Sequence, residues 1–145
     1  MTKHQTLTAV DTDDLQIISA QLQDAVTRAG DLVWLPKSRR FAALFNRFRW
    51  ENGKAEGERV RSGLHFDSVL TVKSFKFRRD DPKAVASLLA IAFKPRGNED
   101  PGGTIELVFS GGGMIRLEVE SIEAGLSDIS GPWAARGRPV HELGD

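Results

Sequence analysis

The chain has 145 residues, 20 basic and 20 acidic side chains, and no cysteine. This length corresponds to about one domain. The lack of cysteine excludes disulfides, thiolate metal sites and cysteine nucleophiles. No apolar run reaches the roughly 20 residues that a membrane span requires, and the first residues, MTKHQTLTAVDTDD, lack the apolar core of a signal peptide. We therefore expect a cytoplasmic protein without a membrane segment.

Alternation of apolar and polar residues predicts strands along most of the chain, separated by clusters of Gly, Pro, Asn and Asp. The expected strands cover residues 15–24, 31–35, 40–50, 59–66, 68–77, 88–94, 104–109, 114–121 and 122–128. One short helix is expected near 82–87, because Asp81 can cap it and Pro82 suits its first position. Residues 1–13 and 131–145 are expected as tails around a single β domain, residues 14–130.

These strands predict a mainly β, antiparallel meander that forms a small barrel or a two-sheet sandwich, since open edges favour aggregation. The sequence does not separate these two forms. A weak internal similarity relates Ile18-x-Ala20-x-Leu22, Thr71-x-Lys73-x-Phe75 and Ile122-x-Ala124-x-Leu126. This similarity favours two related halves, although strand alternation alone also produces it. The glycines at 110–113 precede a further strand, which indicates a hairpin turn and not a phosphate-binding loop.

The zero net charge conceals an uneven distribution along the sequence. Residues 37–79 contain twelve Lys or Arg and four acids, whereas residues 98–128 contain seven acids and one base, Arg116. If these stretches lie on different faces, the molecule has a basic side and an acidic side that attract partners or copies of itself. The alternative is an ordinary solvated surface.

The run RFAALFNRFRW at 40–50 interleaves cations with aromatic residues, as single-strand nucleic-acid sites do. Strand alternation instead predicts that Leu44, Asn46, Phe48 and Trp50 share the core face, with Arg47 and Arg49 in water. The broken segment 131–139 adds Trp133 and Arg136, which either dock back onto the domain or anchor a second chain. The candidate interaction residues are therefore Arg47, Arg49, Arg59, Arg61, Trp133 and Arg136.

Two further groups of residues raise the question of catalysis. His65 and Asp67, with Ser62 or Ser68, resemble a nucleophile set, but neither a nucleophile elbow nor an oxyanion loop surrounds the serines. Arg116, Glu118 and Glu120, extended by Glu106, form a charged ladder that is typical of a solvated sheet face, although paired carboxylates also serve as acid and base. We predict no catalytic residue, no metal site and no cofactor.

The strings LQIISAQLQDAV, LVWLPKSRRFAALFNRFRWE, RSGLHFDSVL, SLLAIAF, TIELVFSGGGMIRLEVESIEAGLSDI and PWAARGRP together resemble an uncharacterised bacterial family, classed as a domain of unknown function and common in alphaproteobacteria. The resemblance covers roughly residues 14–139. It implies no assigned activity, cofactor or catalytic residue.

The leading hypothesis is a noncatalytic module that binds a protein partner or a second copy of itself. The first alternative is single-stranded nucleic-acid binding through the basic aromatic strands. The second is an enzyme with a small-molecule pocket at the mouth of the barrel, in which His65 and a carboxylate act as acid and base.

Overall fold

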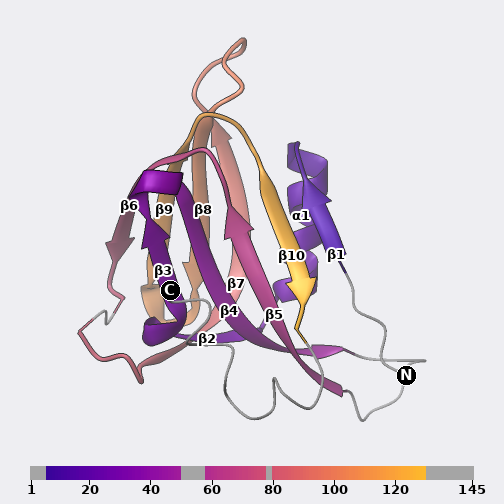
Figure 1. The fold of residues 1–145 in the computed structure, drawn as a ribbon, viewed down its shortest axis with the longest axis vertical. Helices are drawn as coiled ribbons and strands as arrows, with labels where there is room; N and C mark the ends of the chain where they lie inside the picture. The colour runs from indigo at the N-terminus through magenta and orange to yellow at the C-terminus, as the bar shows by residue number, and fades with distance from the viewer. Residues whose placement is uncertain (1–5, 50–57, 78–79, 130–145) are drawn as a thin grey trace.

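The computed structural model describes residues 6–49, 58–77 and 80–129, which form an antiparallel sheet and one α-helix (Figure 1). The helix is α1 (Thr12–Leu22). The strands are β1 (Thr6–Ala9), β2 (Val26–Arg28), β3 (Leu32–Leu35), β4 (Arg40–Arg49), β5 (Glu58–Phe66), β6 (Val69–Phe75), β7 (Val85–Pro95), β8 (Gly103–Phe109), β9 (Met114–Val119) and β10 (Ala124–Asp128). Short 3-10 turns occur at η1 (Ala29–Asp31), η2 (Pro36–Ser38) and η3 (Ser110–Gly112).

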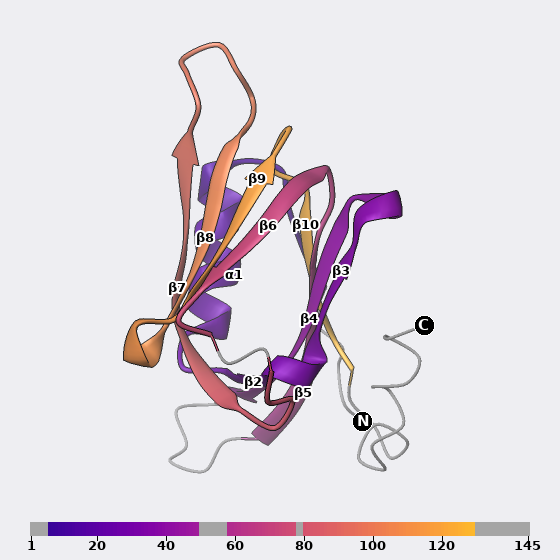
Figure 2. The same cartoon turned by 90° about the vertical axis from the view of Figure 1, so that its left-hand side faces the viewer.

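The strands follow the order β1-β10-β5-β4-β2-β7-β8-β9-β6, and β3 pairs with the first half of β4. The sheet bends so that β6 to β9 face β3, β4, β5 and β10 across the core (Figure 2). Among the described strands, β1 and β6 pair with one neighbour each, so the sheet does not close into a barrel. The prediction of a mainly β, antiparallel fold is confirmed, and the closed-barrel form of it is wrong.

Residues 15–24 were predicted as a strand, and this prediction is wrong because most of them belong to α1. The Asp11 side chain caps this helix by accepting a hydrogen bond from the backbone N–H of Asp14 at 2.8 Å. The buried residues are spaced as on one helical face: Leu15, Ile18, Ser19 and Leu22. No helix in the described part of the chain is long and apolar enough to span a membrane.

The first copy of the proposed internal repeat, at Ile18 to Leu22, therefore lies in a helix. The second copy lies in β6 and the third lies around the start of β10. Because the three copies do not share a secondary structure, the similarity does not divide the fold into two related halves.

The helix expected near 82–87 is also absent, since these described residues form a turn and the start of β7. The N–H of Ala84 donates to the carbonyl of Asp81 at 3.0 Å, and the N–H of Lys83 donates to the Asp81 carboxylate at 3.0 Å. Asp81 thus caps a turn and not a helix. Val85 then begins β7 by pairing with β2, a short strand that the sequence pattern did not predict.

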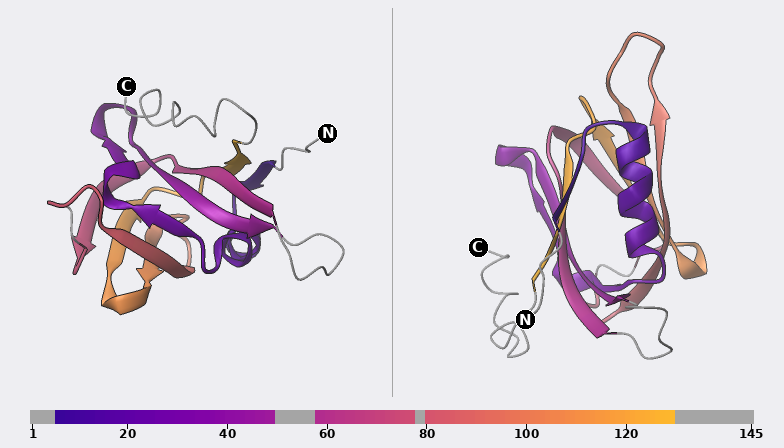
Figure 3. Two further views of the ribbon diagram at one scale, coloured as in Figure 1. Left: turned by 90° about the horizontal axis from the view of Figure 1, so that it is seen from below. Right: turned by 90° about the vertical axis from the view of Figure 1, so that its right-hand side faces the viewer.

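Helix α1 covers the gap between β1 and β7, where a closed sheet would have another strand (Figure 3). Ser19 on the helix accepts a hydrogen bond from the backbone N–H of Ile91 in β7, at 2.9 Å. The segment after the helix exchanges two more backbone hydrogen bonds with Leu88, through the N–H of Asp24 and the carbonyl of Ala25. The helix therefore satisfies part of an edge that would otherwise be exposed.

The faces predicted for β4 are correct for Leu44, which is buried, but wrong for Asn46 and Arg47. Phe41, Ala43 and Phe45 pack in the core, whereas Asn46 is exposed. Arg47 follows the same alternation inward and is 4% exposed.

The guanidinium of Arg47 binds both carboxylate oxygens of Asp128 on β10, at 2.9 and 3.0 Å. Its Nε donates to the hydroxyl of Ser62 at 3.0 Å, and that hydroxyl donates to Asp128 at 2.7 Å. Both bonds to Asp128 come from Nη2 of Arg47, and a buried charge is tolerated when it is paired and hydrogen-bonded in this way.

Replacement of the buried carboxylate tests this network. We expect Asp128→Ala to lower the free energy of unfolding by about 3–5 kcal/mol, because it removes the carboxylate that the buried guanidinium binds. Urea unfolding followed by circular dichroism measures the loss. The matched control is Glu120→Ala, which breaks an exposed pair with Arg39 at 2.9 Å and should cost less than about 1 kcal/mol. Equal losses in the two variants would contradict the assignment.

Candidate functional site

An apolar cavity lies where the sheet fails to close, between β3 and β4 on one side and β6 and β9 on the other. Its volume is about 310 Å³. The described residues that line it are Ala29, Leu32, Trp34, Phe41, Val72, Ser74, Phe77 and Ile115. We call it the seam cavity. Its size, and the aliphatic or aromatic nature of every lining side chain except Ser74, are typical of a small-ligand site.

Each wall of the seam cavity comes from a strand with an unpaired edge. Within the described sheet, β3 pairs with β4 only, and β6 pairs with β9 only. Leu32, Trp34 and Val72 are partly buried and pack against the core, so the strand period that builds the core also directs these side chains into the cavity.

One end of the seam is closed by backbone contacts. The N–H of Val69, at the start of β6, donates to the carbonyl of Arg39, next to β4, at 2.9 Å. Nearby, the guanidinium of Arg39 pairs with Glu120 at 2.9 Å. In Figure 2, β6 approaches β3 and β4 at this end and separates from them toward its other end. An added strand therefore cannot run along the whole seam.

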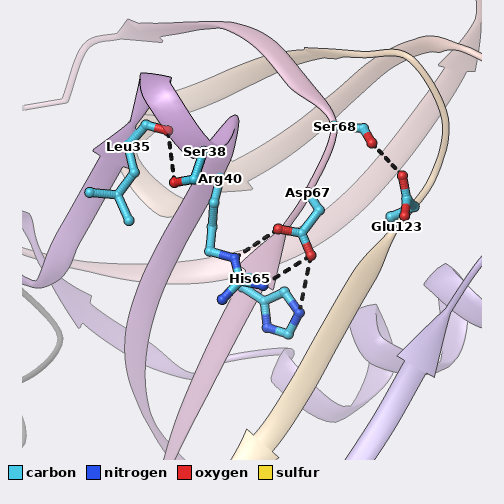
Figure 4. Close-up of polar contacts among 7 residues, drawn as sticks. All are labelled: Leu35, Ser38, Arg40, His65, Asp67, Ser68 and Glu123. Atoms are coloured by element: carbon cyan, nitrogen blue, oxygen red, sulfur yellow. Dashed lines mark hydrogen bonds and ion pairs between the residues drawn. The ribbon is translucent and has the colours of Figure 1, made fainter.

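The residues considered for catalysis lie away from this cavity. His65 stands on the face of β5 opposite the buried Leu64 and Phe66, and Asp67 follows the strand (Figure 4). The Asp67 carboxylate binds the Arg40 guanidinium through two hydrogen bonds of 2.7 and 3.2 Å, and it lies 3.6 Å from Nε2 of His65. Asp67 is thus held mainly by Arg40.

Neither serine completes a catalytic set with His65. Ser62 is buried on the opposite face of β5, between Arg47 and Asp128. The hydroxyl of Ser68 donates to the carboxylate of Glu123 (Figure 4). The two serines are therefore bonded to partners other than His65.

The imidazole of His65 lies over Gly125, its partner in the register of β5 and β10. A Cβ atom at position 125 would lie 2.4 Å from the imidazole Cε1, so glycine provides the space for this ring. Burial, and then the charge of Arg40, lower the pKa of His65, and the nearby Asp67 only partly opposes this. The neutral imidazole is therefore favoured in the folded state.

The structure does not gather the predicted interaction residues on one described surface. Arg47 is internal, and Arg61 is half-buried with its guanidinium 3.8 Å from Asp31. Arg59 is exposed. The side chain of Arg49, and Trp50, Trp133 and Arg136 altogether, lie outside the described residues.

The two oppositely charged stretches of sequence contact each other in the fold. Arg39 and Arg47 from the basic stretch pair with Glu120 and Asp128 from the acidic stretch. The charge segregation seen along the chain is therefore partly neutralised by pairing, and these contacts do not produce opposite basic and acidic faces.

The predicted ladder of charged residues is only partly solvated, because Glu106 is 5% exposed and Glu120 follows the end of β9. Glu106 lies between Arg116 at 3.2 Å and Lys94 at 3.3 Å, and Glu118 accepts a hydrogen bond from Thr104 at 2.8 Å. Among the described residues, no three His, Asp or Glu side chains are grouped to hold a metal ion.

The seam cavity was not predicted from the sequence. Trp34 and Val72 had been assigned to strands, but their alternation gives only the face on which they lie. The missing information was which two strand edges remain unpaired, and this depends on long-range strand order.

Residues 5–141 match a family described as a protein of unknown function, DUF2948. The chain belongs to this family. The resemblance of residues 14–139 to a domain family of unknown function is thus confirmed, and its occurrence in alphaproteobacteria stays a prediction. The region matched to DUF2948 includes β1 and every described residue that lines the seam cavity. No curated protein and no solved structure matches the chain.

The pKa of His65 predicts a pH dependence of stability in this DUF2948 protein. The unfolded chain binds a proton at His65 from about pH 6.5 downward, before the folded protein does. The histidine therefore contributes stability above that pH, and the contribution is lost as the pH falls toward the lowered folded pKa.

Urea unfolding of the wild type and of His65→Gln between about pH 8 and 5 measures this contribution. We expect the stability of the wild type to fall more steeply than that of the variant below about pH 6.5. The difference between the two curves removes the effect of the other titrating groups. Parallel curves would show that His65 does not contribute in this way.

Proposed function

We propose that this protein is a noncatalytic binding module that holds an apolar group in the seam cavity. The observation that carries this proposal is an apolar cavity of about 310 Å³ at an unpaired junction of the sheet. Seven of its eight described lining side chains are aliphatic or aromatic, and Ser74 supplies the one hydroxyl.

The hydrophobic effect provides the driving force for such binding. Each methylene group removed from water contributes about 0.8 kcal/mol. The closed end at Val69 and Arg39 favours a compact apolar group or a short chain over a continuous strand of a partner.

The composition of the cavity supports binding more than chemistry. None of its described lining residues is an acid, a base or a histidine. General acid–base catalysis requires such a group within hydrogen-bonding reach of the substrate. His65, the candidate acid or base, lies on the other face of β5 from the buried core residues.

The broader expectations drawn from the sequence stay predictions. They are a protein partner or self-association, nucleic-acid binding as an alternative, and a cytoplasmic location. The inward position of Arg47 removes one residue from the proposed nucleic-acid surface.

Titration with Nile red, an uncharged apolar dye, tests the proposed function. We expect saturable binding with a rise in dye fluorescence, accompanied by a change in tryptophan emission because Trp34 lines the cavity. Ala29→Leu should weaken binding about tenfold by occupying space inside the cavity.

The matched control is Ala20→Leu, the same substitution on the exposed face of α1, which should bind the dye as the wild type does. Circular dichroism establishes that both variants are folded. Equal affinities in Ala29→Leu and Ala20→Leu, or no saturable binding by the wild type, would overturn the proposal.

A further inference from the structure

A second, smaller cavity adjoins the seam cavity. Its volume is about 170 Å³, and the described residues lining it are Lys76, Phe77, Ala84, Val85, Ala86, Phe109, Ser110 and Gly113. Phe77 lines both cavities. The ring of Phe77 packs edge-to-face on Phe109, with the ring centroids 5.1 Å apart. The ring of Phe77 is therefore a wall that the two cavities share.

The backbone of Lys76 explains how Phe77 comes to lie between the cavities. In a regular strand Phe75 and Phe77 would point to the same face. Phe75 is on the outer face, where the guanidinium of Arg116 lies 5.0 Å from its ring centre. Lys76 has a left-handed backbone with φ of 51°, which ends the strand and redirects Phe77 inward.

The charges around this region favour an anion at one end. Among the described residues lining the two cavities, none is acidic, and Lys76 is the one cation. The Lys76 side chain passes the β8–β9 turn, where its Cδ would be in van der Waals contact, at 3.5 Å, with a Cβ at Gly112. The described residues that line the seam cavity at the other end carry no charged side chain.

We propose that the ligand of this region is an alkyl carboxylate, with its hydrocarbon chain in the seam cavity, its middle against Phe77 and its carboxylate at Lys76. This inference rests on the proposed function and adds the charge and polarity of the ligand. The apolar walls contribute most of the affinity, and the ammonium group of Lys76 selects a head group with a negative charge. Because Lys76 is exposed, the head-group selectivity is modest, and an exposed ion pair corresponds to about fivefold in affinity.

Competition with bound Nile red by octanoate, octanol and octylamine, at low salt and neutral pH, tests the inference. These probes share one chain length and differ in head-group charge. We expect octanoate to bind about fivefold tighter than octanol, and octylammonium to bind more weakly than either. The preference for octanoate should shrink as salt is added, because salt screens exposed charges.

Lys76→Met should make octanoate and octanol bind about equally. Lys73→Met is the matched control, since Lys73 is an exposed lysine on β6 that is not among the residues lining either cavity, and it should keep the preference for octanoate. Circular dichroism of both variants verifies folding.

The outcomes separate this inference from the proposed function. Displacement of the dye by all three probes with equal affinity would overturn the carboxylate assignment and leave the apolar site in place. Equal effects of Lys73→Met and Lys76→Met would also overturn it, since net charge alone would then account for the preference. Failure of the wild type to bind the dye or any probe would overturn both.

Discussion

The incomplete closure of one strongly bent sheet governs the rest of this structure. A sheet that does not close has edges, and unpaired backbone groups at an edge must be covered or left to solvent. One open side of this sheet is covered by a helix, and the other is only partly closed. Helix α1 covers the side between β1 and β7, with Ser19 bonded to the backbone of β7. On the other side, β6 approaches the start of β4 and forms a backbone hydrogen bond at one end, from Val69 to Arg39. The seam cavity exists because the rest of that side is not paired.

The buried ion pair of Arg47 and Asp128 links strands inside the same bent sheet. It connects β4 to β10 across β5, and Ser62 on β5 completes the network. Gln21 of α1 lies 3.4 Å from the same guanidinium. The guanidinium of Arg47 is therefore bonded to β5 and β10 and also contacts α1, the helix that lies between β1 and β7. Such a network requires its partners to be correctly placed, because a buried charge without them is costly.

Strand periodicity in the sequence predicted the elements from β3 to β10 but failed at α1. Ile18, Ala20 and Leu22 alternate as in a strand, while Leu15, Ile18, Ser19 and Leu22 are also spaced as on a helical face. Short segments satisfy both periods, and the deciding signal was the cap at Asp11 with acids in the first turn. The opposite error occurred at Asp81, whose capping side chain serves a turn because Val85 must pair with β2. Asp11 and Asp81 are both capable of capping a helix, and the segments that pack against them determined whether a helix forms.

The face of β4 shows why sequence alone did not place the candidate site residues. An alternating strand has two faces, and the sequence gives no direct measure of which one is inside when each contains apolar residues. Placing arginine outside was the reasonable choice, but Asp128 lies 81 residues away and makes the inward position of Arg47 favourable. The same dependence on long-range order applies to the seam. Trp34 and Val72 line one cavity because β3 and β6 face each other there and are not paired in the described sheet. One local feature was readable in principle: a lysine between two phenylalanines at the end of a strand. Its left-handed backbone places one ring outside and one inside, and so brings a cation next to an apolar cavity.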